Sequence, residues 1–588
     1  MIRSKEGREL YLDTMQLAWD GYGQARIEQR LTADGNGRMD LHSYSRMLTV
    51  LSCLIHGGRK RDAAALWEEM MVGCCKEIAD SEGNHEADFA MKEIMFSALI
   101  VKDVLSEWET IRTRWAPLLE RAEPYRTFVS VWREGEDPSH LHNINVYNMV
   151  GEYMREREGL TDSGAYFARH WPEQLTRFDG NGMYRDPGNP ILYDITTRAH
   201  IALLLGFGYD GPFASELDER LRQAGPLTLF MQSAAGEFAY GGRSNGFLFN
   251  ESLLAAIAEY EAVRYKREGN DVLAGAFKRS ARMAAESIAP WLGMEQPRHL
   301  KNKFPVASKH GTEGYGYYDK YMITMGAFLA IGYWLCDDSI AESPCPAETG
   351  GYVWETSESF HKVFAGAGGY SVEVDTSADL HYDATGLGRI HRSSLPSELA
   401  LSSPLTDHEA YALSPGFERI SATIGPGWPR QDGSVRYLSA CTGLQAEVTI
   451  VAATPELAEF TIRYCGDELG DCGGIKETYR ISAAGVELDM ELEDPGAAEI
   501  AVRVPLLVTN GLEETERLLS PDRIQVLLGD AVYECKISGD GSLAISEMVY
   551  GNRNGAYAMA EWTLPGNKAS LLLTLNKRAL NTASTWKG

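Results

Sequence analysis

The first half of the chain repeats apolar residues at spacings of three and four, the period of a helix with one buried face. Twelve segments with this pattern are predicted to be helices: 8–22, 43–57, 61–80, 88–105, 109–121, 144–158, 162–177, 194–205, 213–232, 247–267, 271–289 and 319–336. Twelve helices joined by short turns form antiparallel pairs. Six such pairs close into an (α/α)6-type toroid, whose inner helix ends and connecting loops line one cleft.

Beyond about residue 350 the pattern changes to alternation with period two. Strand-like segments begin at Tyr370, Leu444, Phe460, Val486, Ile500, Ile524, Tyr533 and Leu571. Gly, Asp, Asn and Pro separate them, which is typical of an antiparallel β-sandwich. The linker over 337–350 is rich in Asp, Ser and Pro. We therefore expect a helical toroid over 1–340 that carries catalysis, followed by an antiparallel sandwich over 350–588.

Charge narrows the range of partners. The 588 residues include 83 acidic and 56 basic side chains, giving a net charge of −27. Such a charge disfavours nucleic acid and anionic membrane surfaces as partners. An acidic substrate would need a local positive patch, so Arg and His side chains in loops are candidates for binding it. The sequence carries no signal for an oligomeric state.

Location and cofactors are suggested by what the sequence lacks. Charged residues stand at 3–9, where a secretory signal has an apolar run, and the nine cysteines form no C-x-x-C pair. We expect a cytoplasmic protein with reduced thiols. His140 and His142 have no third ligand at a known spacing, and the G-x-G-x-x-G at 206–211 follows a predicted helix. No metal or cofactor is therefore expected.

The stretch 309–318 is unusually rich in chemically active side chains. It holds His310, Glu313, Tyr315 and Tyr318 among three glycines and one further phenol, and Tyr321 follows. Such a mixture is typical of a wet cleft that binds sugars or transfers protons. The structural alternative is an aromatic loop that closes the helical domain.

Three further loops between predicted helices combine amides, imidazoles, phenols and charges. Their candidate residues are His142, Asn143 and Asn145 in the first, Tyr193, Asp194 and Arg198 in the second, and Glu237, Arg243, Asn250 and Glu251 in the third. Helix capping is the alternative role for the amides and for the aspartate. The third loop also matches the G-x-S-x-G elbow at 242–246, but its neighbourhood is helical, which argues against a serine hydrolase.

One segment of the β half differs from the rest. Residues 381–392 carry His381, Arg389 and His391, and strand interiors rarely hold such a charged set. We expect a long loop or strand end that completes the cleft, with a solvated basic rim as the alternative.

The domain order and these loops together resemble carbohydrate-active enzymes in which an (α/α) toroid precedes an antiparallel β-sandwich. This group includes heparinase- and alginate-lyase-like polysaccharide lyases, and its toroid is shared with uronate-active glycoside hydrolases such as β-glucuronidases. The resemblance implies an oligo- or polysaccharide substrate containing uronic acid. In such lyases an Asn or His neutralises the uronate carboxylate and a Tyr or His removes the C5 proton. The positions that look like these roles are His142, Asn143, Asn145, His310, Tyr315 and Tyr318.

Elimination and hydrolysis require different catalytic residues. A proton next to a carboxylate leaves only if donors stabilise the developing charge while a phenol or imidazole takes the proton. Hydrolysis instead needs two carboxyl groups about 5–5.5 Å or about 6.5–9.5 Å apart. The candidates for that pair are Asp194, Glu237, Glu251 and Glu313.

Three hypotheses follow: a lyase acting by β-elimination, which we favour, a glycoside hydrolase, and a non-catalytic carbohydrate-binding or structural protein. The predicted catalytic residues are His142, Asn143, Asp194, His310, Glu313, Tyr315 and Tyr318. The predicted substrate contacts are Asn145, Tyr193, Arg198, Glu237, Arg243, Asn250, Glu251, His381, Arg389 and His391.

Overall fold

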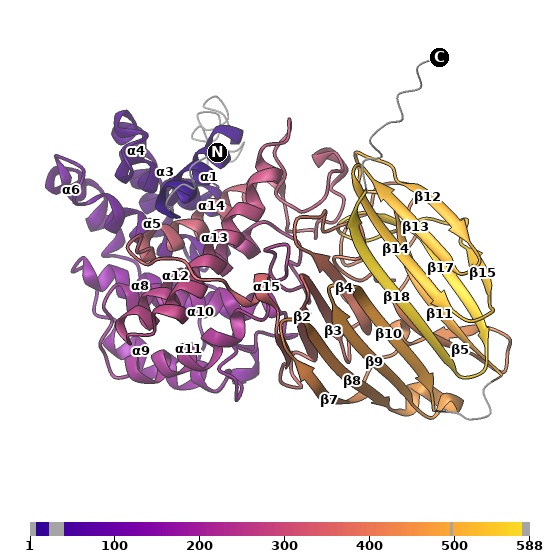
Figure 1. The fold of residues 1–588 in the computed structure, drawn as a ribbon. Coiled ribbons are helices and arrows are strands. Elements are labelled where there is room, and N and C mark those ends of the chain that lie inside the picture. Colours follow the sequence, from indigo (N-terminus) through magenta and orange to yellow (C-terminus); the bar gives the residue numbers. More distant parts are fainter. Residues whose placement is uncertain (1–6, 23–39, 494–497, 579–588) are drawn as a thin grey trace, which may run out of the picture.

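Helices and strands occupy separate halves of the protein. The computed structural model describes residues 7–22, 40–493 and 498–578. The last long helix ends at Leu335 and the first strand begins at Tyr352. Figure 1 shows the helical half, indigo to magenta, beside the sheets, orange to yellow. The predicted order of a helical half and an antiparallel β half is confirmed.

Six inner helices form a closed ring. They are α3 (Leu41–His56), α5 (His85–Val101), α8 (Asn143–Arg157), α10 (Ile191–Gly206), α12 (Phe249–Arg267) and α14 (Tyr318–Leu335). Each contacts the next one in this order, and α14 contacts α3. These helices are buried around most of their circumference, as expected for the inner layer of a toroid.

The outer layer consists of amphipathic helices. These are α1 (Gly7–Tyr22), α4 (Ala64–Ala79), α6 (Trp108–Leu119), α9 (Gly164–Leu175), α11 (Ala214–Thr228) and α13 (Asp271–Leu292), with the short α7 (Pro124–Thr127) and α15 (Pro346–Thr349) between elements. In α11, for example, Leu217, Leu221 and Ala224 are buried, and the acidic and basic positions between them face solvent. All twelve predicted helices are present. No helix in the described ranges is both long and apolar enough to cross a membrane.

The inner helices start at the same end of the ring. Glu86, in the first turn of α5, accepts a hydrogen bond from Leu41 N at the start of α3 (3.1 Å) and one from Lys320 Nζ at the start of α14 (3.2 Å). At the start of α8, Asn143 N donates to Asp186 Oδ1 in the loop before α10 (2.7 Å). The loops that precede the inner helices therefore meet at one end of the toroid.

The strands form three antiparallel sheets. The first contains β1 (Tyr352–Glu355), β2 (Lys362–Ala367), β3 (Tyr370–Asp375) and β4 (Gly386–Arg392). The second has the order β12 (Glu516–Ser520), β13 (Arg523–Leu528), β14 (Ala531–Ser538), β18 (Lys568–Lys577), β10 (Gly485–Leu492), β9 (Ile475–Ser482), β8 (Leu457–Cys465) and β7 (Gln445–Ala453). The third has the order β15 (Ser542–Ile545), β17 (Ala556–Pro565), β11 (Glu499–Thr509), β5 (Gly425–Pro429) and β6 (Val435–Tyr437), with β16 (Tyr550–Gly551) paired to β17.

The sheets share one apolar core. Strand β18 of the second sheet contacts β11 and β17 of the third, and β2 of the first contacts β8 and β9. Alternate residues point into this core, such as Val486, Leu488 and Met490 of β10. The sandwich therefore presents its first sheet to the toroid (Figure 1).

The expectation of a long loop or strand end over 381–392 is wrong for residues 386–392. They form the interior of β4 rather than a loop. Their polar groups are buried against the helical half, where Arg389 Nη1 donates to Phe238 O (2.7 Å) and His391 Nδ1 lies 2.9 Å from Ser233 Oγ. A strand interior can hold these side chains because the neighbouring loop supplies their hydrogen-bond partners.

Candidate functional site

Three hydroxyl groups line up where the loops meet. Tyr193 Oη, in the first turn of α10, is 2.9 Å from Ser244 Oγ in the loop before α12. Ser244 Oγ is 3.0 Å from Tyr315 Oη in the loop before α14. Tyr193, Ser244 and Tyr315 are called the hydroxyl series below. Ser244 is fully buried, whereas Tyr193 is partly buried and Tyr315 is 39% exposed, so the central hydroxyl is the most enclosed of the three.

The backbone around Ser244 is held in an unusual shape. Ser244 has φ +63°, between Gly242 at +78° and Gly246 at +80°. The Ser244 N–H donates to Glu313 Oε1 (2.6 Å), which also accepts from Arg553 Nη2 (2.7 Å). A left-handed conformation at a residue other than glycine costs free energy and persists only where the surroundings fix it. Ser244 is therefore placed between the two phenols by contacts from outside its own loop.

A guanidinium group lies beside the series. The Arg243 guanidinium carbon is 4.6 Å from the centre of the Tyr193 ring, and Arg243 also pairs with Asp186 and donates to Pro187 O (2.6 Å). Asp186 Oδ1 accepts from both Asn143 N (2.7 Å) and Asn143 Nδ2 (3.0 Å). Asp186 thus joins the start of α8 to the loop that carries Arg243.

Burial sets the protonation of these groups. It raises the pKa of Tyr193, although Arg243 and the Ser244 hydroxyl act in the opposite direction. It also raises the pKa of Tyr315. Burial lowers the pKa of His142, so this ring is neutral near pH 7. The site therefore combines neutral donors with phenols, one of which has a cation against its ring.

His310 and Tyr318 lie apart from the hydroxyl series. His310 Nδ1 accepts from Ser414 N (3.0 Å) and Nε2 lies 2.8 Å from Asn552 O, so both ring nitrogens are occupied by the β half. Tyr318 packs edge-on against His299, with ring centres 5.3 Å apart. Of the predicted catalytic residues in 309–318, the structure brings Tyr315 and Glu313 to the series.

Several other predicted residues serve the packing of the helical half. Asp194 and Arg198 form a fully buried ion pair (2.6 Å), and Asp194 Oδ1 also accepts from Tyr184 N. Asn145 Oδ1 accepts from His142 N (3.0 Å), which is a helix-capping contact. Asn250 Nδ2 donates to Ser244 O (3.3 Å) and so helps to hold the hydroxyl series.

The four carboxylates proposed for hydrolysis all have cationic partners. Lys301 Nζ lies 3.1 Å from Glu237 Oε2 and 2.5 Å from Glu251 Oε1. Against the effect of burial, Lys301, His391 and Arg389 lower the pKa of Glu237 to about 2. Asp194 pairs with Arg198, and Glu313 pairs with Arg553. Burial raises the pKa of Glu251 and of Asp194, as a general acid requires. A general acid must also reach the substrate, however, and both side chains are fully buried and ion-paired, which disfavours hydrolysis.

Residues 381–392 of the β half contact the helical half at the loop before α12. Asp383 Oδ2 accepts from Gly242 N (2.7 Å), next to Arg243. Arg389 and His391 are buried in the contact between the halves, and His381 is exposed. The segment thus supports the Arg243 loop rather than exposing a patch of three cations.

Sequence reasoning missed three residues of the site. Ser244 had a signal in its glycine-flanked elbow pattern, because that pattern marks a turn with positive φ. Asp186 stood in a Pro/Gly loop with no sign of its partners. Arg553 lies 240 positions from Glu313, and no local pattern connects them.

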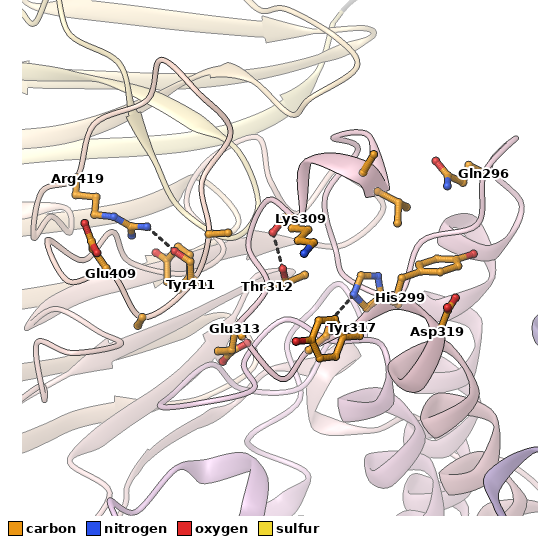
Figure 2. A pocket seen from close by; sticks show the side chains of 17 residues that line it. Gln296, His299, Lys309, Thr312, Glu313, Tyr317, Asp319, Glu409, Tyr411 and Arg419 are labelled. Carbon is orange, nitrogen blue, oxygen red and sulfur yellow. Dashed lines mark hydrogen bonds between the residues drawn. The ribbon is translucent and has the colours of Figure 1, made fainter. Parts of the chain in front are cut away.

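A cavity borders the site. It has a volume of about 790 Å³ and lies between residues 296–319 and 409–419. Figure 2 shows Lys309, Glu313, Tyr317 and Tyr411 around it. Among the described residues that line it, Glu313 also contacts the hydroxyl series. In the described ranges, no group of three or more His, Cys, Asp or Glu side chains could hold a metal ion.

Comparison with known proteins gave matches among solved structures alone. No protein family and no curated protein matches the chain. Heparinase III is 7% identical, with a TM-score of 0.49 over 94% of this chain and 79% of that one. Chondroitin AC lyase from Streptomyces coelicolor A3, in complex with chondroitin sulphate, is 10% identical, with a TM-score of 0.48 over 96% of this chain and 79% of that one. The chain is thus similar along most of its length to these two polysaccharide lyases.

Proposed function

We propose that the protein cleaves an oligo- or polysaccharide containing 4-linked uronic acid by β-elimination. The observation that carries this proposal is the hydroxyl series beside Arg243, with Asn143 and His142 at the adjacent helix start. It offers a base, an acid and carboxylate-binding donors in one place. The carboxylates that hydrolysis would need are instead paired with cations, which favours elimination.

The proposed reaction uses the two phenols in opposite roles. Tyr193, as the phenolate stabilised by Arg243, takes the C5 proton of the uronate. The C5 electrons form the C4=C5 double bond as the bond from C4 to the glycosidic oxygen breaks, and Tyr315 protonates the leaving oxygen. Neutral donors from His142 and Asn143 stabilise the charge that develops on the carboxylate.

Ser244 restores the starting state in this scheme. After elimination Tyr193 carries an extra proton and Tyr315 lacks one. The Ser244 hydroxyl accepts the proton from Tyr193 while it donates its own to Tyr315, over the 2.9 and 3.0 Å contacts. No proton is gained or lost over the cycle.

The test compares wild-type protein with Tyr193→Phe and Tyr315→Phe on a panel of uronate-containing polysaccharides. We expect the wild type to give product that absorbs in the ultraviolet through its C4=C5 bond. Each phenylalanine variant should lower kcat by about 10²–10⁴-fold with a much smaller change in KM. Tyr533→Phe, at a buried phenol of β14, is the matched control and should retain full activity.

Two results would overturn the proposal. New reducing ends without ultraviolet absorbance would identify hydrolysis, and Glu313→Gln would then be the variant to examine first. Full activity in both Tyr193→Phe and Tyr315→Phe would remove the phenols from the reaction.

A further inference from the structure

The cavity next to the hydroxyl series has the features of a ligand site. Its volume of about 790 Å³ lies in the range of about 300–1,000 Å³ that is usual for ligand pockets. It is formed by both halves of the protein, with residues 296–319 on one side and 409–419 on the other. Figure 2 shows labelled side chains from both segments around the cavity.

Two residues that line the cavity each carry a buried polar atom without a partner among the described residues. Glu313 is 4% exposed and Tyr411 is 3% exposed. Within the described residues, neither Glu313 Oε2 nor Tyr411 Oη has a hydrogen-bond partner. Buried polar atoms are usually satisfied, so an acceptor and a hydroxyl left open at one cavity point to a ligand with hydroxyl groups.

The rim adds an aromatic face and a cation. Tyr317 is 54% exposed, and Lys309 Nζ lies 5.8 Å from the centre of its ring. The Arg419 guanidinium is occupied by the carbonyl oxygens of His408 and Tyr411, so it shapes the wall. An exposed aromatic ring suits the apolar face of a pyranose, and a nearby ammonium group suits a carboxylate.

We propose that this cavity binds a further uronic acid residue of the same oligosaccharide, beyond the residues held at the hydroxyl series. The inference rests on the proposed function for the identity of the sugar. A pyranose hydroxyl donates to Glu313 Oε2, another accepts from Tyr411 Oη, the ring stacks on Tyr317, and the carboxylate faces Lys309.

Glu313 links this subsite to the reaction. Its Oε1 accepts from the Ser244 N–H (2.6 Å), while its Oε2 has no partner among the described residues and Glu313 lines the cavity. A sugar in the cavity therefore contacts the same carboxylate that positions Ser244. We expect longer substrates to raise kcat as well as affinity.

The test measures binding by calorimetry in a Tyr193→Phe background, so that the proposed cleavage is suppressed. The probes are a disaccharide and a tetrasaccharide of β-1,4-linked glucuronic acid. We expect the tetrasaccharide to bind at least about tenfold more tightly than the disaccharide.

Adding Tyr317→Ala or Tyr411→Phe to this background should remove most of the difference in affinity and leave the affinity for the disaccharide unchanged. Tyr317 is exposed, so its replacement does not threaten folding, and Tyr533→Phe is the matched control.

The outcomes separate this inference from the proposed function. Equal affinity of the two probes, or a tetrasaccharide affinity unchanged by Tyr317→Ala, would overturn the subsite even if the wild type makes unsaturated product. A length effect that Tyr317→Ala abolishes would support the subsite even if the wild type makes no such product. Lys309→Gln should weaken the glucuronic acid tetrasaccharide and not cellotetraose, and an equal effect on both would contradict the choice of a uronate.

Discussion

Ser244 shows how much depends on one small side chain. Its hydroxyl contacts both phenols, at 2.9 and 3.0 Å, and its backbone, at φ +63°, donates a hydrogen bond to Glu313. A glycine would adopt this backbone more readily but would carry no hydroxyl. The strained conformation is consistent with a functional role for the side chain.

Replacing Ser244 with alanine should therefore lower kcat and leave KM nearly unchanged, because the proton path between Tyr193 and Tyr315 is interrupted. The loss should be smaller than in the phenylalanine variants, since solvent can slowly reprotonate the exposed Tyr315. Steady-state kinetics test this, with Ser252→Ala, a buried serine of α12, as the control. An unchanged kcat would exclude the relay.

The pH dependence of the rate tests the role of Tyr193. Burial raises the pKa of this phenol, and only its deprotonated form accepts the C5 proton. We expect kcat/KM to rise with pH through the neutral and mildly alkaline range. In Arg243→Gln the rise should move to higher pH, because the phenolate loses its neighbouring cation. A profile that falls above pH 7 would contradict a phenolate base.

The burial of His310, whose two ring nitrogens contact the β half, makes stability depend on pH. Burial lowers its pKa to about 4, from about 6.5 when unfolded. Below pH 6.5 the unfolded chain binds a proton that the folded protein does not, so stability decreases as the pH falls toward 4. We expect Tm to decrease over this window and the slope to be smaller in His310→Gln. His408→Gln, at an exposed histidine, should match the wild type.

At the scale of elements, the loops before the inner helices form the site. Their location could be predicted, because the helical period defined where each inner helix starts and which loop precedes it. Which side chains meet could not be predicted. His310 and Tyr315 are five positions apart, yet one contacts Asn552 in the β half and the other contacts Ser244. Loop conformation decides this, and it depends on contacts that are distant in sequence.

The β half fixes one of these loops through a buried ion pair. Arg553, in the turn between β16 and β17, pairs with Glu313, and both side chains are about 2% exposed. Removing one partner of such a pair costs about 3–5 kcal/mol. Arg553→Met should lower the free energy of unfolding by that amount and increase amide exchange over 309–316.

The control for this prediction is Arg503→Met, since the pair of Arg503 with Glu561 is more exposed and should contribute less. If exchange over 309–316 does not change in Arg553→Met, the ion pair does not order the loop.

At the scale of the whole molecule, the fold could be predicted because apolar residues recur with the period of a helix in the first half and with the period of a strand in the second. All twelve helices and the eight strand segments agree with the structure. Strand β4 was missed because its polar side chains are satisfied by the other half, which no strand pattern records. The contact between the halves is what local sequence could not reveal.

The common direction of the six inner helices also shapes the electric field of the protein. Each helix start carries roughly half an elementary positive charge, so the ring gathers about three at the end where the loops meet. The protein as a whole has a net charge of −27 and repels a polyanion at long range. Salt screens the distant repulsion more than the close attraction, since the Debye length is about 8 Å at physiological ionic strength. An acidic chain should therefore associate faster in moderate salt than in water, the reverse of what a basic cleft on a basic protein would give.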